Sequence, residues 1–204
     1  MTMSIAEEKK AVRAAAVLRR DAAHARLKDT APAALAANFL AHFALAKDAV
    51  VSAYWPGRSE FDVRPLLLAL HARGHALALP VVVARGTPLL FRRWRPGEAL
   101  EAKPFGLQEP RAAAGELAPT VLLVPYLAID RDGYRVGYGA GFYDRTLTTL
   151  RAQGRVLAVG VGYAAQEVER LPHDGYDERL DASVTEEGVK EFAAAQRAAV
   201  GSGR

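Results

Sequence analysis

Four short apolar runs constrain the fold of this chain more than any other feature of its sequence. Each run has the length of a β-strand and stands between stretches of helical composition. Strands that are apolar along their whole length are typical of parallel sheets with both faces covered. The sequence therefore predicts an α/β fold, a layered α/β/α sandwich on a mostly parallel mixed sheet. The runs are AVVSAYW (49–55), ALALPVVV (76–83), TVLLVPY (120–126) and VLAVGVGY (156–163).

The stretches between these runs predict the rest of the architecture. Residues 95–120 contain four prolines and three glycines, a composition that predicts a long loop. Thr185 is a suitable N-cap for a last helix that follows the segment LDASV. With 204 residues and no internal repeat or linker, the chain 1–204 is expected to form a single domain. Helices are expected near 6–27, 32–45, 61–73 and 142–153, and a short strand at LLFRRW (89–94).

Composition excludes several classes of function. The chain has no cysteine, so disulfides, thiolate nucleophiles and cysteine-bound zinc are excluded. The net charge of +4 suits anionic ligands, but the basic residues are spread along the chain, which does not indicate a nucleic-acid tract. No apolar run approaches the roughly 20 residues of a membrane-spanning helix. The N-terminus lacks the apolar core of a signal peptide, so a cytoplasmic protein with no membrane partner is expected.

The segment RVGYGAGFYDR (135–145) carries three glycines at alternate positions, just before a predicted helix. Glycine lets backbone N–H groups approach a ligand closely, and a helix N-terminus favours an anion. This combination predicts a phosphate cradle, although the spacing matches neither the dinucleotide fingerprint nor the Walker A loop. A tight glycine turn without a ligand is the alternative.

Asp144 and two flanking arginines strengthen the case for phosphate binding. A carboxylate in the first helical turn would repel a phosphate unless a Mg²⁺ ion bridged the two. Arg135 and Arg145 could balance the remaining negative charge. Asp177 and Asp181 are further acids that could complete a metal shell. The alternatives are an acid that complements the helix dipole, exposed arginines and solvated loop acids.

Two other segments supply candidate ligand-binding residues. Lys9, Arg13 and Arg20 can share one face of the first predicted helix, where a solvated basic face is the alternative. Glu60 follows a predicted strand and precedes a helix, at the end of the strand where α/β proteins bind ligands. A helix-capping acid is the alternative for Glu60.

Together these segments resemble the 5-formyltetrahydrofolate cyclo-ligase family over nearly the whole chain. The strongest element is VPYLAIDRDGYRVGYGAGFYDRTL (124–147). Each of the other segments is weak alone, but their order matches that of the family: KKAVR, YWPGRSEFD, LALP, PFGLQEP, GVGYAAQ and LPHDGYDERLDASVTEEG. Four positions depart from the commonest family residue, namely Ile129, Ala140, Phe142 and Tyr176.

The resemblance implies an enzyme that converts 5-formyltetrahydrofolate and ATP, with Mg²⁺, into 5,10-methenyltetrahydrofolate, ADP and phosphate. It also implies a fold similar to the ribose-isomerase and CoA-transferase-like class, and we expect a monomer. Arg135, Tyr143 and Arg145 are the residues expected to act in catalysis, and Asp144 and Asp177 those expected to bind the metal. The residues expected at ATP are Lys9, Lys10, Arg13, Arg135, Gly137, Tyr138, Gly139, Ala140, Gly141, Phe142 and Tyr143. Those expected at the folate are Trp55, Glu60, Tyr138, Gly139, Ala140, Gly141 and Phe142.

Two other functions remain as alternatives. A relative with the same fold could bind a nucleotide or a folate without turning it over, although such a protein would be free to lose Asp144 or Arg135. A nucleic-acid-binding protein is suggested only by the isoelectric point of about 9.5.

Overall fold

The computed structural model describes residues 4–192 and is built around a seven-stranded mixed sheet. Five adjacent strands run parallel in the spatial order β2, β1, β6, β9, β11, and an antiparallel strand closes each edge. The predicted α/β fold on a mostly parallel sheet is confirmed. The strands are β1 (Val50–Ser52), β2 (Ala76–Val81), β3 (Leu90–Trp94), β6 (Val121–Pro125), β9 (Leu157–Val161), β11 (Ala182–Val184) and β12 (Val189–Glu191).

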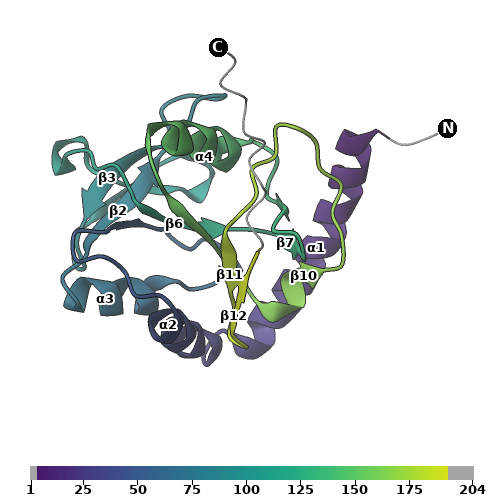
Figure 1. The fold of residues 1–204 in the computed structure, drawn as a ribbon, viewed down its shortest axis with the longest axis horizontal. Coiled ribbons are helices and arrows are strands. Elements are labelled where there is room, and N and C mark those ends of the chain that lie inside the picture. The colour runs from purple at the N-terminus through teal and green to yellow at the C-terminus, as the bar shows by residue number, and fades with distance from the viewer. Residues whose placement is uncertain (1–3, 193–204) are drawn as a thin grey trace, which may run out of the picture.

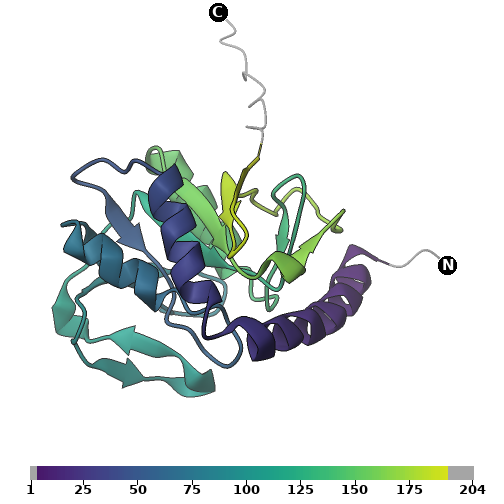
Figure 2. The ribbon, with the colours of Figure 1, turned by 90° about the horizontal axis from the view of Figure 1, so that it is seen from below.

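Helices cover both faces of this sheet, as expected for strands that are apolar on both sides. Figure 1 shows α4 (Phe142–Gln153) on one face and α2 (Ala31–His42) and α3 (Arg64–Ala72) on the other. Along β6 the side chains alternate between two separate cores. Leu123 packs in the core that contains α2 and α3 residues, whereas Leu122 and Val124 pack in the core that contains Leu147 of α4. Figure 2 shows α2 and α3 side by side beneath the sheet.

The strand order places a topological switch point between β1 and β6. The connection from β1 leads through α3 to β2, and the connection from β6 leads through α4 to β9 on the opposite side. The segments that leave the carboxyl ends of β1 and β6 therefore diverge and open a crevice, which is where open α/β sheets bind ligands.

A small second sheet attaches the N-terminal helix to this crevice. It consists of β7 (Ala128–Asp130), β8 (Arg135–Val136) and β10 (Glu167–Val168), with β7 in the centre. Helix α1 (Ile5–Leu27) begins at a capping box formed by Ser4 and Glu7. It packs against the small sheet through a core of Ala16, Val12, Val17, Leu127, Ala128, Val136, Val168 and Leu171.

Two predicted elements differ in the structure. The expected loop at 95–120 contains a hairpin of β4 (Leu100–Ala102) and β5 (Gln108–Pro110), with short 3₁₀ turns at Pro104–Gly106 and Ala112–Ala114. The expected last helix after Thr185 is wrong up to residue 192, because Val189–Glu191 forms strand β12 against β11. The rest of that predicted helix lies outside the described residues.

The other helices end within a few residues of their expected bounds. The helix expected at 32–45 ends at His42, and the one expected from 61 begins at Arg64. Among residues 4–192 no helix combines the length and the apolar character needed to cross a membrane.

Candidate active site

A cavity of about 1530 Å³ opens at the carboxyl ends of β1, β2 and β6. Its wall also includes the N-terminal half of α1, the glycine-rich loop 137–141, the first turn of α4 and the loop 174–178. Pockets for one small ligand usually occupy about 300–1,000 Å³. The cavity is therefore large enough to hold two ligands of ordinary size side by side.

The glycine-rich loop 137–141 adopts a conformation that depends on two of its glycines. Gly139 has φ of 95° and Gly141 has φ of 66°, both in the region that disfavours other residues. A Cβ atom on Gly141 would lie 2.8 Å from Nη1 of Arg145, and one on Gly139 would lie 3.2 Å from the Arg13 guanidinium. The glycines therefore allow two arginines to lie directly against the backbone of the loop.

These two arginines bind carbonyl oxygens of the loop. Arg13 of α1 donates from Nε to the carbonyl of Gly137 at 2.9 Å. Arg145 of α4 donates to the carbonyl of Ala140 and lies over the ring of Phe142. Both arginines line the cavity. In this conformation they hold the loop in place.

Arg135 and Asp144 form an ion pair at the cavity wall. Nη2 of Arg135 lies 2.9 Å from Oδ1 of Asp144, and Nη1 donates to the backbone carbonyl of Glu178 at 2.5 Å. The Arg135 side chain is only 5% exposed, whereas that of Asp144 is 26% exposed. Asp144 also accepts a hydrogen bond from the amide of Glu178. The pair thereby joins α4 to the loop 174–178.

A second ion pair joins α1 to the same loop. Nζ of Lys9 lies 2.6 Å from Oδ2 of Asp177 and 3.5 Å from Oδ2 of Asp174. The side chains of Lys9 and Asp177 are 14% and 16% exposed, so this end of α1 is not the solvated basic face considered above. The Tyr176 backbone amide donates to Asp174 and, with Lys9 nearby, lowers the pKa of that carboxyl.

The two carboxylates predicted to bind a metal do not form a preassembled metal site. Among residues 4–192 no three His, Cys, Asp or Glu side chains are grouped so that they could hold an ion. Asp144 and Asp177 line the same cavity, and each is paired with a cation. Magnesium is commonly held by one or two carboxylates together with substrate phosphates. The donor set therefore fits a Mg²⁺ ion that arrives with a phosphate ligand.

The opposite wall of the cavity is aromatic and includes one partly buried acid. Trp55 packs edge-on against Trp94 at 5.4 Å between ring centroids and lines the cavity. Glu60 lies on the same wall and accepts a hydrogen bond from the amide of Gly57 at 3.0 Å. Burial raises the pKa of Glu60, and the Gly57 amide and the charge of Arg20 oppose this shift. This wall can bind a planar ring and offer it one hydrogen-bonding carboxyl group.

Tyr143, in the first turn of α4, is a further aromatic residue of the cavity. Burial, followed by the charge of Glu60, raises the pKa of the Tyr143 hydroxyl well above its usual value. The hydroxyl is therefore protonated at neutral pH. It can donate a hydrogen bond in the cavity, which Tyr143 lines.

The raised pKa of Glu60 has a consequence for stability. Below the ordinary value of 4.5, Glu60 is protonated in both the folded and the unfolded chain. As the pH rises, the unfolded chain releases this proton first, so the free energy of unfolding falls until the pH exceeds the folded-state pKa. We expect Glu60→Gln to raise the free energy of unfolding at pH 7 by about 1 kcal/mol and to change it little at pH 4.

Urea unfolding at the two pH values measures this difference. Glu169→Gln is the matched control, because Glu169 is highly exposed and pairs with Arg131 at the surface. It should change the free energy of unfolding by less than about 0.5 kcal/mol at either pH. A Glu60→Gln protein that is less stable than the wild type at pH 7 would contradict the expected cost of the buried charge.

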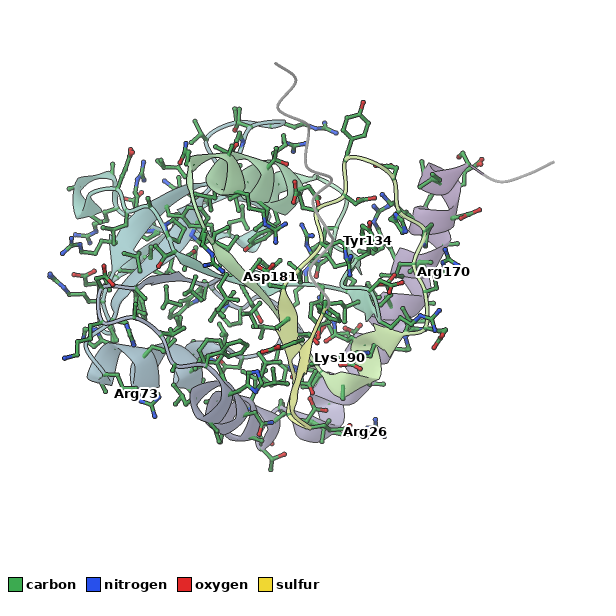
Figure 3. The ribbon with its side chains drawn as sticks, viewed as in Figure 1. Arg26, Arg73, Tyr134, Arg170, Asp181 and Lys190 are labelled. Atoms are coloured by element: carbon green, nitrogen blue, oxygen red, sulfur yellow. The ribbon has the colours of Figure 1, made fainter. Side chains whose placement is uncertain are left out.

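The structure brings most of the predicted site residues to this one cavity, whereas Lys10, Asp181 and Arg20 do not line it. Lys10 is exposed and does not line the cavity, in contrast to its neighbour Lys9. Asp181 accepts hydrogen bonds from Ala158 and Arg151 near the amino ends of β9 and β11, away from the carboxyl ends that form the site. Figure 3 labels Asp181 beside β11. Asp181 therefore has a structural role.

Arg20, the third residue of the basic face predicted for the first helix, does not line the cavity itself but contacts a loop that does. It shares a helical face with Lys9 and Arg13, and this spacing was the available signal. Its side chain is only 3% exposed and hydrogen-bonds to Tyr138 of the glycine-rich loop.

Comparisons with known proteins match most of the chain. Residues 5–186 match the model of the 5-formyltetrahydrofolate cyclo-ligase family. A 5-formyltetrahydrofolate cyclo-ligase of Escherichia coli is 34% identical over 139 residues, which are 65% of this chain and 75% of that protein. One of Mycolicibacterium smegmatis is 42% identical over 135 residues, 61% of this chain and 68% of that protein. The solved structure of 5,10-methenyltetrahydrofolate synthetase from Aquifex aeolicus superposes with a TM-score of 0.75 and 28% identity, covering 92% of this chain and 94% of that one.

Proposed function

The chain belongs to the 5-formyltetrahydrofolate cyclo-ligase family, and on that basis we propose that it is a ligase that makes 5,10-methenyltetrahydrofolate from 5-formyltetrahydrofolate. We further propose that the reaction consumes ATP, requires Mg²⁺ and releases ADP and phosphate. The observation that supports this most is the presence of two cation–carboxylate pairs, Arg135 with Asp144 and Lys9 with Asp177, on one cavity.

These pairs suit a ligand that carries both negative phosphates and a positive metal ion. When such a ligand enters, the phosphate oxygens can take the place of the carboxylates beside Lys9 and Arg135. Asp144 and Asp177 are then free to hold the Mg²⁺ ion, which would offset the charge of the phosphates. No buried charge is left without a partner during this exchange, which is the condition for burying ions at a tolerable cost.

The chemical steps require no nucleophile from the protein. In the proposed reaction the formyl oxygen attacks the γ-phosphorus of ATP, and the bond from that phosphorus to the β–γ bridging oxygen breaks to release ADP. N10 of the folate then attacks the formyl carbon, N10 loses its proton, and the oxygen leaves as phosphate. Both nucleophiles belong to the substrate, so the absence of cysteine from the chain is no obstacle.

The residues of the cavity would align the two ligands and stabilise the charge on the transferring phosphoryl group. Arg135, Lys9 and the N–H groups of loop 137–141 lie on the side proposed for the nucleotide. Trp55, Glu60 and Tyr143 lie on the side proposed for the pteridine ring. Placing two ligands in one cavity makes the attack of the formyl oxygen effectively unimolecular, which is a large source of rate enhancement.

One assay tests this proposal directly. Purified protein is mixed with 5-formyltetrahydrofolate, ATP and Mg²⁺, and the methenyl product is followed by its ultraviolet absorbance. We expect absorbance to grow in proportion to enzyme and to require both ATP and Mg²⁺. Folded protein that binds both ligands without producing the chromophore would instead be a binding relative without turnover.

Lys9→Ala is expected to raise the KM for ATP by about tenfold with a smaller effect on kcat. A charge-assisted hydrogen bond to a phosphate contributes roughly 1.5–3 kcal/mol, and about 1.4 kcal/mol corresponds to a factor of ten. The measurement is the ATP dependence of the absorbance assay at saturating folate. Lys47→Ala removes an exposed lysine for which the described residues show no ion pair, and it serves as the control. An unchanged KM for ATP would mean that Lys9 serves only its pair with Asp177.

A further inference from the structure

One buried arginine connects the two sides of the cavity. Arg20 lies in α1 and is only 3% exposed. Its Nε donates to Oγ of Ser59 at 3.1 Å, and its Nη1 donates to the hydroxyl of Tyr138 at 2.7 Å. Ser59 belongs to the loop that follows β1 and carries Glu60, whereas Tyr138 belongs to the glycine-rich loop 137–141. Ser59 and Tyr138 are 79 residues apart along the chain and share this guanidinium.

Further contacts fix the two partners of Arg20. Ser59 accepts from Arg20 and donates in turn to a carboxylate oxygen of Asp21, the next residue of α1. The guanidinium also lies over the ring of Tyr138, 5.6 Å from its centroid. Tyr138 is otherwise 58% exposed at the mouth of the cavity. Without Arg20, the glycine-rich loop would lose this contact with α1.

The cost of burying Arg20 also indicates more than a packing role. Its nearest carboxylate among residues 4–192 is that of Asp21, at 3.8 Å and about half exposed, and its two close partners are neutral hydroxyls. Buried charges are usually compensated by closer ionic partners. The charge of Arg20 also lowers the pKa of Glu60, against the effect of burial. Arg20 therefore contacts both loops, Ser59 on the side proposed for the folate and Tyr138 on the side proposed for the nucleotide.

We propose that Arg20 is a positioning residue that couples the loop 57–60 to the glycine-rich loop 137–141, so that binding on one side of the cavity orders the other. This inference rests on the proposed function for the identity of the two ligands. A ligand that fixes Tyr138 fixes Arg20, and Arg20 then holds Ser59 beside Glu60. By thermodynamic linkage the coupling is reciprocal, so each ligand should tighten the other by the same factor.

The first experiment requires no activity. Amide hydrogen exchange is measured in Arg20→Ala, Arg20→Lys, Ser59→Ala and Tyr138→Phe. Arg19→Ala is the matched control, since Arg19 is the exposed neighbour on the same helix. We expect faster exchange in both loops for Arg20→Ala, mainly in 57–60 for Ser59→Ala, mainly in 137–141 for Tyr138→Phe, and in neither loop for Arg19→Ala.

The second experiment measures the coupling itself. The Kd of a non-hydrolysable ATP analogue with Mg²⁺ is determined with and without 5-formyltetrahydrofolate. Allosteric couplings typically correspond to factors of about 5–150. In the wild type and in Arg19→Ala we expect the folate to change the Kd of the analogue at least about fivefold. In Arg20→Ala we expect the two Kd values to be nearly equal. Arg20→Lys keeps the charge without the planar fork, so it should still bind each ligand and show reduced coupling. It also replaces Arg20→Ala if that protein does not fold.

Specific results would overturn the inference. If the Arg20 variants kept the coupling of the wild type, or if hydrogen exchange in both loops were unchanged, Arg20 would contribute only to the stability of α1. Equal Kd values of the analogue with and without the folate in the wild type would also contradict the coupling. Failure of the proposed function gives a different result. The wild type then makes no methenyl product, while the variants still show the expected pattern of hydrogen exchange.

Discussion

Asp144→Asn is expected to lower kcat by roughly 1,000-fold, because phosphoryl transfer depends on correctly held metal ions and cations. Asparagine keeps the shape of the side chain and can still accept the hydrogen bond from the Glu178 amide. The substitution removes only the negative charge, and with it the anionic ligand proposed for Mg²⁺. It also leaves Arg135 without its ionic partner, so this guanidinium becomes available to a phosphate.

The same substitution therefore separates metal binding from nucleotide binding. We expect the affinity for an ATP analogue without Mg²⁺ to be equal to or higher than that of the wild type, and the tightening caused by Mg²⁺ to be largely lost. Equilibrium titrations of the analogue with and without Mg²⁺ measure both effects independently of turnover. Asp48→Asn is the control, because it makes the same charge change at an exposed site outside the cavity. Undiminished turnover and a wild-type response to Mg²⁺ would remove Asp144 from the metal role.

The sequence predicted the central sheet because burial on both faces leaves a strong local pattern. Each of the four apolar runs contains a strand, β1, β2, β6 and β9, within a few residues of the expected bounds. The two- and three-residue strands outside these apolar runs were missed, because so few residues carry no periodicity of their own. The segment Val189–Glu191 forms a strand through its pairing with β11, and this contact overrides the helix suggested by the N-cap at Thr185.

The sequence predicted most of the residues that the structure brings to one cavity, but it did not predict how they pair. Glycine spacing and a neighbouring acid indicated a phosphate loop, and the structure places this loop at the cavity. The bond between Lys9 and Asp177 joins residues 168 positions apart, a distance over which spacing gives no information. Arg145 was expected to balance phosphate charge, and in this conformation it lines the cavity and donates to the carbonyl of Ala140. Composition alone cannot show whether an arginine binds a ligand or the loop that binds it.

Arg135→Ala is expected to have the second large effect, on stability and on catalysis together. The guanidinium is almost fully buried and joins Asp144 to the carbonyl of Glu178. Its removal leaves two acceptors without this donor at the cavity wall. Breaking a buried pair typically costs 3–5 kcal/mol, and the partial exposure of Asp144 reduces the expected loss to about 2 kcal/mol. Losing an arginine that stabilises a transferring phosphoryl group lowers kcat by roughly 1,000-fold or more.

The variant Arg135→Lys separates these two contributions. Lysine keeps the positive charge as a single point, so it can approach Asp144 or the Glu178 carbonyl but cannot reproduce the fork that binds both. We expect it to recover most of the stability in urea unfolding and to remain at least about tenfold below the wild type in kcat. Arg131→Ala is the control, since its pair with Glu169 is exposed and should contribute less than about 1 kcal/mol. If Arg135→Lys restored full turnover, the positive charge alone would be sufficient, and the geometric role assigned to the guanidinium would be wrong.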